Sequence, residues 1–196
     1  MNDRNVRLAL AALSFATASL AAAFTLPARA ADAPLAADNQ WSTFSVDSAL
    51  EPSLSWIDDS GSPLSFDFIV GAGFEGTLTI VDAVFGGDTF KVTNFGKLLG
   101  GTSSVPLADI GSAVDHGYDF DAALADKSFS SAVFMLGAGS YHIGGFLDQS
   151  LLIDGQRLDA TLGAVRLSVA PIPEPSTFAI LLAGLAAVGL VVRRRS

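Results

Sequence analysis

Four aspartates in the middle of the chain, Asp115, Asp119, Asp121 and Asp126, are close enough in sequence to suggest a cation site. Calcium takes about six to eight oxygen ligands, and carboxylates in a flexible loop are a common source. The spacing is not that of an EF-hand, which needs Asp or Asn, Gly and Glu at other positions. We therefore favour aspartates that cap a helical turn and line a loop, with calcium as the alternative.

Two histidines, His116 and His142, could belong to a Ser-His-Asp triad. The sequence has no Gly-x-Ser-x-Gly turn that would expose a nucleophile. His142 falls in an expected strand, where an ordinary sheet histidine is the favoured interpretation. Glutamates are scarce, so a glycosidase pair of carboxylates is weakly supported. No catalytic residue is predicted.

Residues 71–76 fit the Gly-x-Gly-x-x-Gly pattern of dinucleotide sites. Such a site needs a helix directly after the glycines, because the helix N-terminus binds the pyrophosphate. Residues 77–81 are mostly β-branched and typical of a strand instead. We interpret the glycines as turn residues in a hairpin connection, and no cofactor is predicted apart from the calcium alternative.

Four aromatic residues could stack against sugar rings, namely Trp41, Trp56, Tyr118 and Tyr141. Exposed aromatic side chains above acidic loops are what a carbohydrate-binding sandwich would use. Core filling is the favoured role for most of them.

Composition excludes several classes of protein. The chain of 196 residues has no cysteine, which excludes thiol enzymes, zinc–thiolate sites and iron–sulfur proteins. Residues 31–176 contain nineteen acidic and five basic residues, a net charge of −14. Such a surface repels nucleic acid and anionic lipid, so no nucleic-acid partner is predicted.

Short apolar segments separated by glycine-rich turns predict an all-β fold. Residues 64–70 alternate with period two and place their apolar side chains on one face. Two hairpins are expected, from residues 77–81 with 89–93 and from residues 132–136 with 140–147. This spacing favours a jelly-roll-like β-sandwich over residues 41–170, with one helical turn at residues 119–125.

The N-terminus has the pattern of a signal peptide, predicted at residues 1–30. Arg4 and Arg7 precede an uncharged segment, and Ala28 and Ala30 are the small residues that signal peptidase recognises. Cleavage is expected before Ala31, and residues 31–40 are expected to form a flexible leader.

The C-terminus predicts a short transmembrane helix at residues 178–192. This uncharged segment would be about 22 Å long as a helix, which is short for a bilayer core of about 30 Å. Arg193, Arg194 and Arg195 should hold residues 193–196 in the cytoplasm. The Pro-rich residues 171–177 should form an exposed, extended linker, because proline lacks the N–H that a central strand needs.

Pro173, Glu174 and Pro175, followed by an apolar segment and the arginine cluster, resemble the PEP-CTERM sorting domain. That resemblance implies a Gram-negative bacterium that makes exopolysaccharide. It also implies processing of the tail by an exosortase, a membrane-embedded enzyme similar to cysteine proteases. Residues 119–143 resemble a PEP-CTERM subgroup named for an FxDxA motif, which implies a location and a class but no reaction.

Together these features predict a non-catalytic structural or adhesive protein of the cell surface or the exopolysaccharide matrix. It is expected in the inner membrane until its tail is processed. Its expected partners are signal peptidase, exosortase, the membrane and the exopolysaccharide. One alternative is a carbohydrate-binding module, with or without a dependence on calcium, which a calcium-induced shift in stability would support. The other is a polysaccharide hydrolase, which would need two carboxylates facing each other across a cleft.

Overall fold

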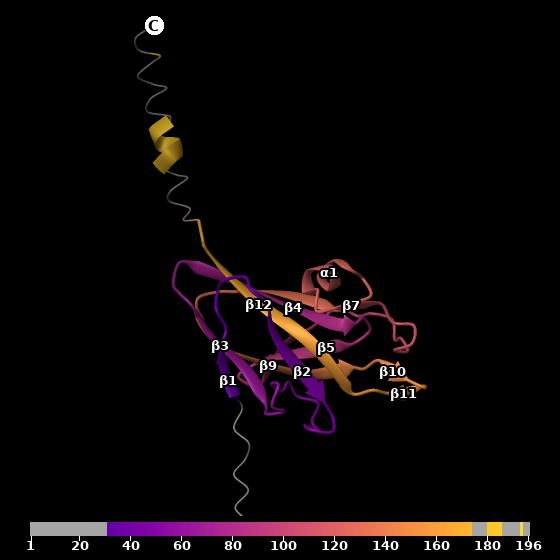
Figure 1. Ribbon diagram of the computed structural model, residues 1–196. Coiled ribbons are helices and arrows are strands. Elements are labelled where there is room, and N and C mark those ends of the chain that lie inside the picture. The colour runs from indigo at the N-terminus through magenta and orange to yellow at the C-terminus, as the bar shows by residue number, and fades with distance from the viewer. Residues whose placement is uncertain (1–30, 174–179, 186–192, 194–196) are drawn as a thin grey trace, which may run out of the picture.

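The computed structural model describes residues 31–173, 180–185 and 193, and its body consists of two β-sheets (Figure 1). Sheet A contains β1 (Ala31–Pro34), β3 (Leu64–Val70), β5 (Thr89–Asn94), β6 (Lys97–Gly101) and β9 (Gly139–Gln149). Sheet B contains β2 (Ser42–Asp47), β4 (Phe74–Phe85), β7 (Asp115–Gly117), β8 (Ser131–Leu136) and β12 (Ala160–Pro171). A small hairpin is formed by β10 (Leu152–Ile153) and β11 (Gln156–Arg157), and the helix α1 is Phe120–Ala125.

The strand order is that of a jelly roll. Sheet A runs β1-β3-β9-β5-β6, and sheet B runs β2-β12-β4-β7, with β8 also paired to β4. The chain therefore crosses from one sheet to the other at most connections, as it does in jelly-roll sandwiches. The predicted all-β sandwich is confirmed, and β1 adds a parallel strand at the edge of sheet A.

Both predicted hairpins are wrong. β4 pairs with β12 and β8, whereas β5 pairs with β9 and β6 in the other sheet. β8 and β9 are likewise in different sheets, and so are β3 and β4, which residues 71–73 connect. Period-two alternation identifies the buried face of a strand but says nothing of its partner.

The sandwich extends beyond the predicted residues 41–170 at both ends. Ala31–Pro34 pairs with β3, so the expected flexible leader begins with a strand. At the other end, Pro171 lies opposite Phe74 in the ladder between β12 and β4. β2 accompanies β12 only as far as Val165, so Pro171 has a strand on one side alone and its missing N–H breaks no second ladder.

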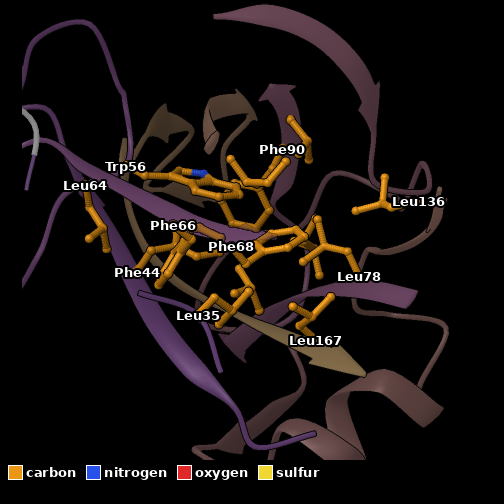
Figure 2. Packing of buried hydrophobic residues seen from close by; sticks show 14 of the residues in the cluster. Leu35, Phe44, Trp56, Leu64, Phe66, Phe68, Leu78, Phe90, Leu136 and Leu167 are labelled. Atoms are coloured by element: carbon orange, nitrogen blue, oxygen red, sulfur yellow. The ribbon is translucent and has the colours of Figure 1, made fainter. Parts of the chain in front are cut away.

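The core lies between the two sheets and is rich in aromatic rings (Figure 2). Phe44 stacks on the buried Trp56 with ring centroids 3.9 Å apart, and Phe90 meets Phe44 edge-on at 5.1 Å. Gly163 in β12 makes room for this group, because a Cβ there would come within 2.3 Å of the Phe44 ring. The two sheets are thus joined through aromatic packing.

α1 confirms the predicted helical turn. The side chain of Asp119 accepts a hydrogen bond from the Ala122 N–H at 2.9 Å and so caps the helix. Ala123 of α1 packs with Val81 and Ala164 of sheet B in a second, smaller cluster.

The predicted signal peptide and most of the predicted transmembrane helix lie outside the described residues. Residues 180–185 are helical and exposed. Among the residues that the structure describes, no helix has both the length and the apolar character needed to cross a membrane.

Candidate functional site

The sequence-predicted sorting tail begins where β12 leaves the sandwich (Figure 1). β12 is paired with β4 over ten residues, and the Ile172 N–H then donates to the Gly73 carbonyl at 2.8 Å. Ile172 and Pro173 are exposed. The tail therefore follows, with no intervening loop, from a long strand of the core.

Several predicted site residues cannot be placed. Ala28, Ala30, Glu174, Pro175, Arg194 and Arg195 lie outside the described part of the chain. Ala31, the residue expected to follow signal peptidase cleavage, begins β1, and Arg193 is described as helical and exposed.

The four aspartates considered as calcium ligands do not converge. Asp119 caps α1, and Asp115 accepts a hydrogen bond from the Gly117 N–H at 2.8 Å. Asp121 accepts from Arg166 Nη1 at 2.8 Å, and Asp126 lies 3.0 Å from His116 Nε2. In residues 31–173 these carboxylates form no group that could share one ion. Capping and loop hydrogen bonds account for all four.

Each histidine is paired with a carboxylate. The His116 ring stacks on Phe129, with centroids 5.0 Å apart. The pKa of Asp126 is lowered mainly by its hydrogen bond from the Ser128 backbone N–H and next by its hydrogen bond with His116. His142 Nδ1 lies 2.8 Å from Asp67 Oδ1 on sheet A. Within the described chain neither ring is hydrogen-bonded to a serine hydroxyl, so neither has the geometry of a Ser-His-Asp triad.

Two carboxyl groups are buried where β4 leads into β5. Asp82 accepts hydrogen bonds from the backbone N–H groups of Ala83, Gly87 and Asp88 at 2.9–3.1 Å. Asp88 Oδ1 accepts from the Leu151 N–H at 2.7 Å, whereas its Oδ2 has no hydrogen-bond partner among the described residues. Asp82 fixes the turn between the two sheets, since it accepts from backbone donors that the turn would otherwise leave unpaired. Asp88 instead ties the turn to Leu151, which follows β9.

Burial changes the acidity of this pair. Burial raises the pKa of Asp88 to about 6. The nearby Thr161 hydroxyl partly offsets this rise, although it is not positioned to donate a hydrogen bond to Oδ2. Burial also raises the pKa of Asp82, and the neighbouring charge of Asp88 adds to that rise. The adjoining cavity of about 200 Å³ is lined mainly by apolar side chains, including Leu151 and Leu162. It offers few groups to orient a polar substrate.

An aromatic patch surrounds α1 on the surface of sheet B and consists of Trp41, Tyr118 and Phe120, with Asp121 and Arg166. Tyr118 is 72% exposed and meets Phe120 edge-on at 6.3 Å. Trp41 lies 5.8 Å from Phe120, and the Arg166 guanidinium lies 4.3 Å above the Trp41 ring. This combination of rings and hydrogen-bonding groups is suited to a sugar surface.

The other two aromatic residues considered for sugar stacking are not at the surface. Trp56 is buried in the core, and Tyr141 is half-buried against Phe68 at 5.1 Å. Phe120 and Arg166 were not predicted as members of a patch. No local pattern links Arg166 to Asp121, because the two are 45 residues apart and meet only through the fold.

Comparison with known proteins gives one family match, in the tail. No curated protein matches the chain. Among solved structures, the pre-peptidase C-terminal domain of a collagenase from Bacillus anthracis is similar at 10% identity, with a TM-score of 0.38 over 73% of this chain and 98% of that one. The FxDxA subgroup is not confirmed. Residues 171–195 match the PEP-CTERM protein-sorting motif. The chain therefore carries a PEP-CTERM sorting tail, which implies export and processing by an exosortase.

Proposed function

We propose that this protein is a non-catalytic structural or adhesive component of the cell surface or the exopolysaccharide matrix, delivered there by its sorting tail. The observation that carries the proposal is the PEP-CTERM motif at residues 171–195, joined directly to β12. The exposure of Ile172 and Pro173 leaves the start of the motif accessible to a processing enzyme. The folded sandwich would then remain intact when the tail is removed.

The distribution of carboxylates supports a non-catalytic role. Each of the four clustered aspartates is engaged by a backbone N–H, an arginine or a histidine. Both Asp82 and Asp88 are buried; Asp82 holds the β4–β5 turn, and Asp88 ties that turn to Leu151. All six carboxylates stabilise the fold through these contacts. A hydrolase would instead need two carboxylates that face each other across an open cleft.

The test is to follow the mass and location of the protein in an exosortase-bearing host. A short tag is inserted at Gly155, in the exposed turn between β10 and β11. We expect a species that lacks the residues after the motif and fractionates outside the inner membrane. A variant with Pro173, Glu174 and Pro175 changed to alanine should stay full-length in the inner membrane. If the unaltered chain also stays there, the proposal is wrong.

A second candidate function is carbohydrate binding through the aromatic patch. It is favoured by the exposure of Tyr118 beside Phe120 and Trp41. We expect Tyr118→Ala to weaken retention of the protein in a gel containing the host exopolysaccharide. Phe95→Ala is the matched control, because Phe95 is 65% exposed and lies on the other sheet. Equal retention of both variants and the unaltered protein would remove this candidate.

A further inference from the structure

Three potential metal ligands meet on the outer face of sheet A, where His142 contacts Asp67. They come from neighbouring strands: Asp32 from β1, Asp67 from β3 and His142 from β9. His142 lies opposite Asp67 in the β3–β9 ladder, and Asp32 lies opposite Ser65, two residues before Asp67. All three side chains therefore project from the same face.

The ligand atoms are close enough to share one ion. His142 Nδ1 lies 2.8 Å from Asp67 Oδ1 and 3.9 Å from Asp32 Oδ1. The three atoms all fall within 4.8 Å of one another. A tetrahedral zinc ion with bonds of about 2.0–2.2 Å keeps its ligand atoms about 3.3 Å apart, so small side-chain rotations suffice.

Two backbone hydrogen bonds and a neighbouring aromatic ring fix the position of His142. Its backbone N–H donates to Asn94 Oδ1 at 3.0 Å, and its carbonyl accepts from the Phe95 N–H at 2.9 Å. The Phe95 ring lies against the imidazole, with centroids 5.5 Å apart and planes 22° from parallel. Phe95 adopts a left-handed φ of 48°, a costly conformation for a bulky residue, and this turn brings its ring over His142.

We propose that Asp32, Asp67 and His142 bind a divalent transition-metal ion such as Zn²⁺, with water in the remaining coordination position. Two carboxylates and one imidazole are a ligand set that this class of ion accepts. The side chains are 41%, 44% and 29% exposed, so an ion can reach them from solvent. On binding, the ring proton occupies Nε2 and leaves the Nδ1 lone pair for the metal.

The ion would fasten the first strand to the sheet. β1 is four residues long, lies at the edge of sheet A and pairs only with β3 in the described chain. Asp32 belongs to this strand, whereas Asp67 and His142 belong to the next two. A metal bridge therefore adds a cross-link that the short parallel ladder lacks, in a protein without cysteine.

The first test is calorimetric titration of the full-length protein with ZnCl₂ in a non-chelating buffer. We expect one ion per chain, and at least tenfold weaker binding in Asp32→Asn and in Asp67→Asn, since even outer-sphere partners of a metal contribute about 10–100-fold. His116→Asn is the matched control, because His116 also contacts an aspartate but has only one such partner. Asp32 makes no hydrogen bond through its carboxylate in the described chain, so Asp32→Asn should fold normally.

The second readout is hydrogen exchange of the backbone amides of Asp32, Ala33 and Leu35, with and without Zn²⁺. We expect the ion to slow exchange there in the unaltered protein and in His116→Asn, but not in Asp32→Asn. No binding at millimolar Zn²⁺, or binding that the two aspartate variants leave unchanged, would overturn the metal site. Binding that leaves exchange at Asp32, Ala33 and Leu35 unchanged would overturn the role in fastening β1.

Discussion

Replacing Asp88 by asparagine should change how the stability of the protein depends on pH. The Asp88 side chain is 1% exposed, and its Oδ2 has no hydrogen-bond partner. Burial raises its pKa to about 6 from an ordinary value of 3.8. The folded chain therefore holds the Asp88 proton more tightly than the unfolded chain does.

The sign and size of the effect follow from this difference. Between pH 3.8 and about 6 the folded state binds more protons, so the free energy of unfolding falls as the pH rises through that window. The full loss is about 3 kcal/mol, of which about half falls between pH 5 and pH 7.5. Asparagine keeps an acceptor for the Leu151 N–H and carries no charge, so this part of the pH dependence disappears. Removing the charge of Asp88 also lowers the pKa of Asp82, which acts in the same direction.

The assay is urea unfolding of Asp88→Asn and the unaltered protein at pH 5 and at pH 7.5. We expect the variant to gain about 1–2 kcal/mol more at pH 7.5 than at pH 5, or about 3–6 °C in Tm. Comparing the two pH values cancels any constant cost of placing an amide at this position. Asp58→Asn is the control, since Asp58 is in an exposed loop where the Ser60 hydroxyl lowers its pKa. Parallel pH profiles for Asp88→Asn and the unaltered protein would refute the reasoning.

Two further substitutions test the packing and the cap. Gly163→Ala should lower the free energy of unfolding by about 1–3 kcal/mol, because its Cβ would fall within 2.3 Å of Phe44 in a close-packed core. Urea unfolding checks this against Gly137→Ala, where nothing lies within 4 Å of the new Cβ, and equal stability of the two variants would contradict it. Asp119→Ala should cost about 1 kcal/mol by removing the cap from the Ala122 N–H. Faster hydrogen exchange of the Ala122 amide would accompany that loss, and an unchanged exchange rate would mean that the cap contributes nothing.

Local sequence patterns predicted local structure well. The alternation in residues 64–70 coincides with β3, whose four alternating apolar side chains are all buried. Asp119 caps α1 as expected for an aspartate before a helical turn. The sorting tail was also predictable, because its three parts are contiguous in sequence.

Long-range arrangement was not predictable in the same way. β4 and β5 adjoin in sequence but lie in different sheets, where β4 pairs with β12 and β5 with β9, because a jelly roll places most successive strands on opposite sheets. Asp67 and His142 are 75 residues apart and meet only through the register of β3 with β9. No spacing rule in a single sequence contains that register.

The pairing of β12 determines how the sandwich would respond to force. A force applied to the C-terminal linker is transmitted to β12, which is held by ten residue pairs to β4 and by six to β2. Because these hydrogen bonds run across the strand, a pull along its axis loads many of them at once in shear. A pull on β1 would load only the four residue pairs that join this edge strand to β3. The C-terminal end is thus the mechanically strong attachment point of this fold, and the N-terminal end is the weak one.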